Sequence, residues 1–388
     1  MSVKSKKVKK MQNTIEFYKP SIQENTKKYI DDVLNFSDNR KVEKLENAVK
    51  KFIGCDNALA TTSGTAALHL AMCALDFKRG DKVICSINVF PSVPQAVRHF
   101  DAEPIFVDIE GKDYNLDLVN LEVALKKNKS KKLKAIILNH MAGNIVDLEA
   151  VYALANEYNV KVIEDASNAL GAKYNGNYIG NTGADITVFS FAPHLCNSTV
   201  NGGILICKEE SVHKRAELLG FHGMQNRHCD TFGSVNYIYD VVDIGWKYDL
   251  SQIEAAYCLA EFEALEATLA RRKEIANMYT EALTGVHHVS LPKISADAVV
   301  SQYIVEIDKN RDHFVGQLKK EDVNISVHYM PLHLTEYYKQ KYSMKVFDYS
   351  VALGCFQRVM SLPMYASLTN DEVKRVCEAI KKVANAHI

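Results

Sequence analysis

The chain has 388 residues, of which 47% are hydrophobic and 24% charged, as in an ordinary folded protein. Lys plus Arg and Asp plus Glu both number 47, which argues against a dedicated nucleic-acid binder. No apolar run approaches the ~18 residues of a transmembrane span. The nine cysteines are scattered and form no CxxC pair. We therefore expect a globular protein of a reducing, cytoplasmic compartment, without a membrane segment or a metal site.

The N-terminal region carries several lysines between Lys4 and Lys10 and has no apolar core of a signal peptide. We interpret residues 1–20 as a flexible basic arm. Binding of an anionic partner is the alternative interpretation of the same charge run.

The middle of the chain alternates short β-branched apolar runs with helical stretches such as 65–75 and 147–158. Continuous apolar strands separated by helices predict a mostly parallel sheet that is covered on both faces. The predicted strands cover residues 82–87, 103–108, 134–140, 160–165, 186–191 and 202–207.

The pattern changes from Ser251 onward. Residues 251–283 keep a helical period without Gly or Pro, which predicts one long helix or two joined helices. The runs 300–307, 324–330 and 371–383 then suggest a smaller α+β domain. We predict a large α/β domain over residues 21–260 and a small C-terminal α+β domain over residues 261–388.

Four segments carry residues that could do chemistry, each where a parallel sheet places its functional loops. The first is the Ser-Gly-Thr turn at Ser63, Gly64 and Thr65, followed by a good helix former. Backbone N–H groups at such a helix start attract phosphate. The same residues could simply cap the helix, since Ser and Thr are favoured there for the same reason.

The second segment is the strand end at Asp165. A carboxylate that closes a buried strand is costly to desolvate unless it meets a positive partner, and a protonated pyridine nitrogen would be one. Capping of the next helix is the alternative.

The third segment runs from Ser190 through His194 to the pair Gly202-Gly203, and its loop histidine is either catalytic or structural. The fourth holds Trp246 and Lys247 before the long helical stretch. Its alternative interpretation is a packed aromatic loop with an exposed lysine.

The order and spacing of these segments resemble the DegT/StrS-type sugar aminotransferases, from about Ile22 to the C-terminus. The similarity includes the motifs SGTAALH, AEPIFVDIEGKDYNLD, VIEDASNALGA, GWKYDLSQIEAA and SVHYMPLH. It implies the fold of fold-type-I pyridoxal-phosphate enzymes, with a large sheet domain and a smaller C-terminal domain. It also implies a homodimer whose active sites are shared between subunits.

The resemblance implies which residues bind the cofactor. Gly64 and Thr65 would hold its phosphate through backbone and hydroxyl groups, and Ser190 would bind the same phosphate. Phe90 would stack on the pyridine ring. Asp165 would pair with the ring nitrogen and keep it protonated, so that the ring accepts electrons.

Three further roles follow from the resemblance. Asn168 matches a position that is usually Gln and contacts the ring or its 3-hydroxyl. Lys247 falls where the family often has an Asn that reaches the phosphate from the neighbouring subunit, so a cation replaces an amide here. His328 would face the substrate.

One departure from the family decides the expected mechanism. The Schiff-base lysine should follow Ser190 by a few residues, but residues 191–207 contain no lysine. The missing lysine aligns with His194 or with Leu195, depending on a one-residue gap, and Lys208 lies beyond the next predicted strand. Without this amine the cofactor, pyridoxamine or pyridoxal 5'-phosphate, would be held non-covalently.

A histidine in this loop would suit an enzyme that moves protons with imidazole. The resemblance then points to the branch of GDP-4-keto-6-deoxymannose 3-dehydratase, which replaces the lysine with His. We therefore expect a dehydratase that deoxygenates a nucleotide-linked 4-keto-6-deoxy sugar, with His194 and Asp165 as its catalytic residues and glutamate as amino donor. The alternatives are a sugar aminotransferase of altered mechanism and a family member that binds a ligand or partner without turnover.

Overall fold

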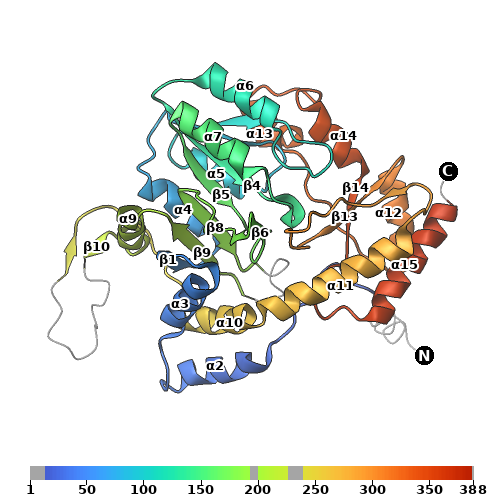
Figure 1. The fold of residues 1–388 in the computed structure, drawn as a ribbon, viewed down its shortest axis with the longest axis horizontal. Coiled ribbons are helices and arrows are strands. Elements are labelled where there is room, and N and C mark those ends of the chain that lie inside the picture. The colour runs from blue at the N-terminus through green and yellow to red at the C-terminus, as the bar shows by residue number, and fades with distance from the viewer. Residues whose placement is uncertain (1–13, 193–199, 226–238, 387–388) are drawn as a thin grey trace.

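The computed structural model describes residues 14–192, 200–225 and 239–386. Its centre is a seven-stranded sheet with the spatial order β1-β9-β8-β5-β4-β2-β3 (Figure 1). Four neighbouring pairs, from β8 to β3, are parallel, whereas β9 runs antiparallel to both β8 and β1. The predicted mostly parallel sheet is therefore confirmed. The strands are β1 (Ala58–Thr61), β2 (Lys82–Ser86), β3 (Glu103–Val107), β4 (Leu133–Asn139), β5 (Lys161–Asp165), β8 (Ile186–Ser190) and β9 (Gly203–Cys207).

Helices cover both faces of this sheet, because its strands are apolar on both sides. Ile137 and Ile163 face one hydrophobic core with α4, α5 and α9, while Ile136 and Val162 face a second core with α3, α6, α7 and α10. Adjacent residues of a strand point to opposite faces, so each strand serves both cores. The helices are α3 (Lys41–Ile53), α4 (Gly64–Ala74), α5 (Ser92–Arg98), α6 (Leu118–Asn128), α7 (Leu148–Tyr158), α9 (Glu210–Gly220) and α10 (Gln252–Glu263).

The C-terminal part has its own core around a three-stranded antiparallel sheet, β12-β13-β14. The long helical pattern divides at Ala264, which ends α10 and precedes α11. Residues 324–330 form no strand and share only one isolated bridge, between Ser326 and Ser361. The elements are α11 (Leu265–Leu283), β12 (Val289–Ser290), β13 (Tyr303–Ile307), α12 (Arg311–Lys320), α13 (Glu336–Lys341), α14 (Ser350–Arg358), β14 (Val359–Leu362) and α15 (Asn370–Asn385).

The described start of the chain packs on this C-terminal core rather than extending into solvent. Ile15 is 1% exposed, and its backbone bonds to Asp322 and Asn324. The expectation of a flexible arm over residues 1–20 thus differs from the structure at Ile15, because a β-branched apolar side chain there finds a buried position. The division into domains 21–260 and 261–388 stays a prediction.

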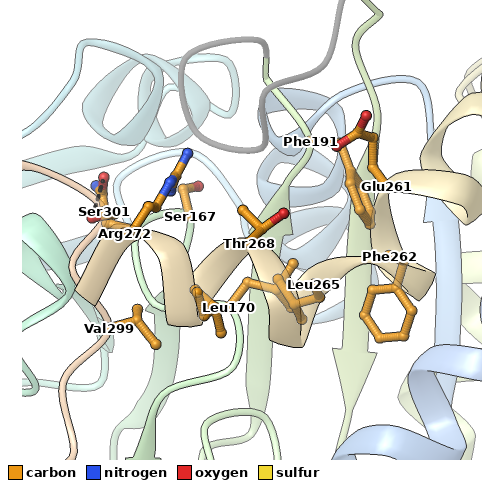
Figure 2. A pocket seen from close by; sticks show the side chains of 12 residues that line it. Ser167, Leu170, Phe191, Glu261, Phe262, Leu265, Thr268, Arg272, Val299 and Ser301 are labelled. Atoms are coloured by element: carbon orange, nitrogen blue, oxygen red, sulfur yellow. Dashed lines mark hydrogen bonds between the residues drawn. The ribbon is translucent and has the colours of Figure 1, made fainter. Parts of the chain in front are cut away.

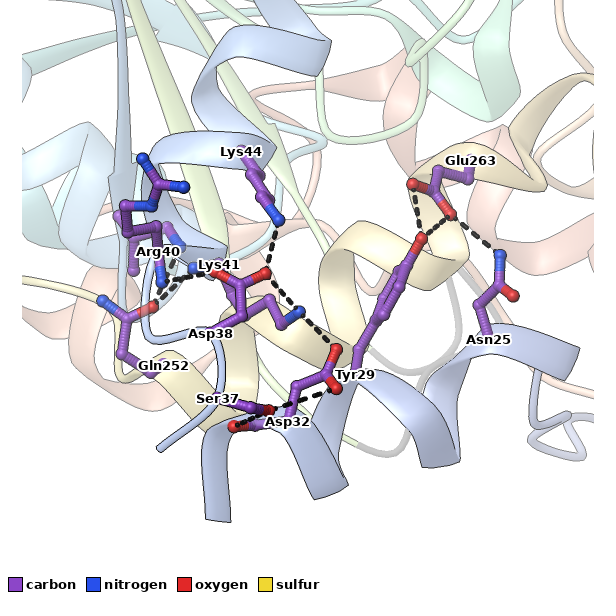
Figure 3. A network of polar contacts seen from close by, with 11 residues as sticks. Asn25, Tyr29, Asp32, Ser37, Asp38, Arg40, Lys41, Lys44, Gln252 and Glu263 are labelled. Carbon is purple, nitrogen blue, oxygen red and sulfur yellow. Dashed lines mark hydrogen bonds and ion pairs between the residues drawn. The ribbon is translucent and has the colours of Figure 1, made fainter. Parts of the chain in front are cut away.

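A polar network attaches α2 (Glu24–Leu34) to α3 and α10, and we call it the α2 junction (Figure 3). The Lys41 ammonium lies 2.9 Å from carboxylate oxygens of both Asp32 and Asp38, although its side chain is only 2% exposed. The Tyr29 hydroxyl donates to Glu263 at 2.9 Å. The buried cation of this junction therefore has two anionic partners.

None of the described helices is both long and apolar enough to cross a membrane. Several small elements complete the fold. The small elements are β6 (Lys173–Tyr174), β7 (Asn177–Tyr178), β10 (Met224–Gln225), β11 (Asp240–Val241) and the 3-10 turns η1 (Met141–Gly143) and η2 (Leu332–Leu334).

Candidate active site

A cavity of about 120 Å³ lies at the carboxyl ends of β4, β5 and β8, beside the start of α4. This edge of the sheet is where open α/β folds bind ligands. The structure brings six of the predicted site residues to its wall, although their roles stay predictions. The lining residues are Gly64, Thr65, Leu68, Val89, Phe90, Ser92, Asn139, Asp165, Ser167, Asn168, Ser190, Ala192 and Tyr329.

The Ser-Gly-Thr turn is both a helix cap and a wall of the cavity. The Ser63 hydroxyl accepts the Ala66 N–H at 3.1 Å, and the first internal bond of α4 runs from Ala67 to the Ser63 carbonyl. The N–H groups of Gly64 and Thr65 precede that bond, so they have no partner within the helix. These two residues line the cavity at the start of α4, which is the positive end of the helix dipole. Such a helix start favours the binding of a phosphate. The two interpretations of this turn are therefore compatible.

Glycines allow the turn to sit tightly against the ends of β8 and β9. A Cβ on Gly64 would lie 2.8 Å from the Ser190 Cβ, and one on Gly203 would lie 2.4 Å from the Ser63 carbonyl oxygen. Both distances are below any normal carbon contact. Gly203 thus lies directly against the turn, whereas a Cβ on Gly202 would meet the Cys258 sulfur at 2.8 Å, and neither glycine lines the cavity.

Asp165 is the acidic group of the cavity. Its Oδ1 accepts the Ser167 hydroxyl at 2.5 Å and the Ser167 N–H at 3.2 Å. Burial raises its pKa above the ordinary value, and these two hydrogen bonds and the nearby His140 oppose that rise only in part. A carboxyl in this state gains most from a cationic ligand, which would lower the pKa again.

Asn139 and Tyr329 line the cavity and were not predicted as site residues. Asn139 ends β4 directly opposite Asp165 in the parallel ladder, and its buried Oδ1 has no hydrogen-bond partner. Parallel strands end at one edge, so this strand register was the signal that could have identified it. Tyr329 had a weaker signal, as the neighbour of the predicted His328.

Phe90 and Asn168 both line the cavity and differ in their surroundings. The Phe90 ring is 56% exposed and stands edge-on to Tyr329, with ring centroids 5.9 Å apart. The Asn168 amide oxygen accepts the Ser301 hydroxyl at 3.3 Å, which links the cavity to the C-terminal part. Phe90 therefore forms an exposed part of the wall, and Asn168 joins the wall to the C-terminal part.

A second cavity of about 20 Å³ adjoins the first through Ser167 and Asn168 (Figure 2). Glu261 lines it and is 4% exposed. Its Oε2 accepts the Gln23 amide at 3.1 Å, whereas its Oε1 has no partner. Burial raises the Glu261 pKa to about 7, against the lowering effects of Gln23 and Arg272. The volume of this second cavity suits about one water molecule rather than a substrate.

Two predicted site residues lie off the cavity wall. The Lys247 ammonium pairs with Asp249 at 2.5 Å and sits 4.5 Å from the Phe221 ring centre. His328 is buried, and its Nδ1 lies 2.8 Å from the Ser361 hydroxyl. The structure therefore places Tyr329, rather than His328, on the cavity. His194 lies outside the described residues.

Among the described residues that line the cavity, none is a lysine. Ser190 pairs with Gly203 at the cavity end of the ladder, whereas Cys207 pairs with Ile186 at the far end. Lys208 follows Cys207, so its backbone starts roughly 13 Å or more along the strand from the cavity, at ~3.3 Å per residue. The expectation that Lys208 is out of reach is consistent with this register.

The sheet, its covering helices and the C-terminal antiparallel unit define the class of fold-type-I pyridoxal-phosphate enzymes. Helicobacter pylori PseC, an aminotransferase involved in the biosynthesis of pseudoaminic acid, shares the fold with a TM-score of 0.86. That similarity is at 22% identity and covers 97% of this chain and 100% of PseC.

The chain belongs to the DegT/DnrJ/EryC1/StrS aminotransferase family, whose sequence pattern matches residues 20–381. It is 31% identical over 352 residues to the spore coat polysaccharide biosynthesis protein SpsC of Bacillus subtilis, covering 88% of this chain and 89% of SpsC. It is 28% identical over 382 residues to the UDP-4-amino-4-deoxy-L-arabinose–oxoglutarate aminotransferase of Shewanella sediminis, covering 94% and 97%. Family membership is thus confirmed, and the dehydratase branch is not singled out.

The residues of the cavity fit the cofactor that is typical of this family. The start of α4 offers N–H groups for a phosphate, Asp165 offers a half-buried anion for a ring nitrogen, and Asn139 has an orphaned amide oxygen. The geometry therefore suits pyridoxal or pyridoxamine phosphate.

Proposed function

We propose that the protein is a sugar aminotransferase-type enzyme that acts on a nucleotide-linked 4-keto sugar and holds its B6 cofactor without a covalent bond. The observation that carries this proposal is a cavity around Asp165 whose residues suit the cofactor, in a chain without lysine between residues 191 and 207. The relative from Shewanella sediminis, named for a 4-amino sugar nucleotide and oxoglutarate, supports the substrate class.

Each part of the cavity would hold one part of the cofactor. Gly64, Thr65 and Ser190 would bind the phosphate, and Asp165 would hold a proton on the ring nitrogen. Phe90 would cover one face of the ring. When bound, pyridoxamine phosphate supplies an amine for a ketone and a ring that accepts electrons.

The electrostatics of the cavity favour a cofactor whose ring nitrogen carries a proton. Because burial raises the Asp165 pKa, this carboxyl is poorly stabilised as an anion until a cation arrives. The pairing of Asp165 with a ring N–H would restore that stabilisation, while Ser167 keeps the carboxylate aimed into the cavity.

A dehydratase that removes the C3 oxygen of the same sugar class is the second candidate. The observation that favours it is the histidine at position 194 in a loop that lacks the Schiff-base lysine. In this role His194 would carry the proton, with imidazole as a competent base near neutral pH.

The partners are proposed on the same basis. Glutamate would return the amine to the cofactor, as the oxoglutarate in the relative's name suggests. A second copy of the chain would complete the site, with Lys247 reaching the phosphate of the neighbouring subunit. We place the enzyme in the cytoplasm, where its scattered cysteines stay reduced.

Mass spectrometry of the product tests the proposal. The protein is incubated with pyridoxamine phosphate, glutamate and a GDP- or UDP-linked 4-keto-6-deoxy sugar. We expect an amino sugar that retains nitrogen; a deoxygenated sugar would favour the dehydratase instead. Borohydride followed by peptide mapping should leave every lysine unmodified, and a trapped lysine adduct would contradict the non-covalent site. A protein that binds neither cofactor form would be a non-catalytic family member.

A further inference from the structure

Tyr329 is the titratable side chain, besides Asp165, that the described residues place on the cavity wall. It belongs to the C-terminal part, whereas the rest of the described wall comes from the first 192 residues. Its position is fixed at both ends. Its backbone N–H donates to the Asn88 amide oxygen at 3.4 Å, and its ring meets Phe90 edge-on.

The Tyr329 hydroxyl lies near the amides of Gln302 and Asn168 and feels the charge of Asp165. The polar amides of Gln302 and Asn168 lower its pKa in part, but burial dominates and, with the nearby Asp165 charge, raises the pKa to about 12. The hydroxyl therefore keeps its proton at neutral pH and is available as a hydrogen-bond donor. The Ser301 hydroxyl donates to the Asn168 amide oxygen and thereby orients this amide.

Two exposed side chains lie next to Tyr329 in the structure or in the chain. Phe90 is 56% exposed and Met330, next to Tyr329, is 46% exposed. A ligand in the cavity therefore has Tyr329 on its wall together with Asp165. A ketone requires a donor at its oxygen, because negative charge develops there when an amine attacks the carbonyl carbon.

We propose that Tyr329 is a catalytic residue that binds the carbonyl oxygen of the keto sugar and donates a proton to it. This inference rests on the proposed function and assigns the substrate-facing role to Tyr329 in place of His328. Pyridoxamine phosphate, where bound, would supply the amine that bonds to the carbonyl carbon, and the C=O π pair would then reside on the oxygen that Tyr329 protonates. The Tyr329 O–H bond breaks as the new O–H bond forms. The nitrogen releases one proton, by way of solvent, which restores the phenol.

Binding can be measured apart from turnover with pyridoxine 5'-phosphate, which has the ring and phosphate but no amine. Calorimetry first gives the affinity of wild type and Tyr329→Phe for this probe, and we expect agreement within about threefold, because the ring that packs on Phe90 is kept. A GDP- or UDP-linked 4-keto-6-deoxy sugar is then titrated into each complex. We expect about tenfold weaker binding by the variant, the usual effect of one lost hydrogen bond.

Turnover with pyridoxamine phosphate should fall about 100-fold in Tyr329→Phe, with most of the loss in kcat, as for removal of a general acid. Tyr337→Phe, which makes the same change at a 54% exposed tyrosine, should behave as wild type. Unchanged sugar binding and turnover in Tyr329→Phe would overturn the role of Tyr329 alone. Failure of wild type to bind any keto sugar nucleotide would overturn the proposed function together with this inference.

Discussion

The active-site cavity and the α2 junction both hold a charged side chain away from bulk solvent, Asp165 half-buried and Lys41 fully buried, but they stabilise the charge differently. In the junction, Lys41 has anionic partners in Asp32 and Asp38, and it also lies 4.6 Å from the Tyr29 ring centre. In the cavity, Asp165 is held by Ser167 alone among the described hydrogen bonds, and Asn139 has an orphaned oxygen. Paired charges hold two parts of a fold together, whereas incompletely paired groups mark the place where a ligand is expected.

The largest expected effect comes from Asp165→Asn. This change removes the anion that would pair with the ring nitrogen, so the affinity for pyridoxamine phosphate should fall about 100-fold. The free energy of unfolding at neutral pH should stay the same or rise, because a poorly stabilised buried carboxylate is lost. Calorimetry and denaturant unfolding give the two quantities. A destabilised variant with unchanged cofactor affinity would assign Asp165 to the structure instead of the site.

Lys41→Met should have the opposite effects to Asp165→Asn, with a loss of stability and no loss of cofactor affinity. The loss of the buried cation leaves Asp32 and Asp38 facing each other, and the free energy of unfolding should fall by about 2 kcal/mol. The affinity for pyridoxamine phosphate should not change. Lys27→Met is the matched control, since Lys27 pairs with Asp31 but is 83% exposed, and its effect should stay below about 0.5 kcal/mol. Weaker cofactor binding by Lys41→Met would break the contrast between the two regions.

Gly203→Ala tests the support behind the phosphate turn. The added Cβ would press against the Ser63 carbonyl. The free energy of unfolding should therefore fall by roughly 1–3 kcal/mol, and the affinity for the cofactor should decrease as well. Gly316→Ala is the control, because no atom outside its own helix lies within 4 Å of the added Cβ. That variant should be neutral or slightly more stable, given the helix propensity of alanine. Equal behaviour of the two variants would contradict the proposed close approach.

Glu261→Gln should have the smallest effect on the free energy of unfolding, and this effect should depend on pH. The folded state holds the Glu261 proton up to about pH 7, whereas the unfolded chain releases it near the ordinary value of 4.5. Wild type should therefore lose stability as the pH rises between these values, and the variant should not. Unfolding at pH 5 and pH 8 should show a relative gain of about 1–2 kcal/mol for the variant at pH 8. A constant difference across this range would show that Glu261 does not titrate.

The sequence predicted the strands and the strand-end residues because continuous apolar runs have few alternative placements. Asp165 and Ser190 were found in this way, at the edge where parallel strands end. The distinction between His328 and Tyr329 could not be made, because residues 324–330 form no strand and the simple alternation of side chains does not apply. The buried Lys41 could not be foreseen either, since lysine in a helix usually faces solvent and only the tertiary contact with α2 buries it.

The pairing of Ser190 with Gly203, and the bond of 2.9 Å from the Phe191 N–H to the Gly202 carbonyl, anchor residues 191–202 at both ends to neighbouring positions of one ladder. The strands on either side thus keep their register whatever residues lie between them. Positions between these anchors can be selected for the reaction they permit, except where packing constrains them, as at Phe191, which is 1% exposed, and at Gly202, whose added Cβ would lie 2.8 Å from the Cys258 sulfur. Divergent evolution could therefore exchange the chemistry of the protein here while the scaffold is inherited intact.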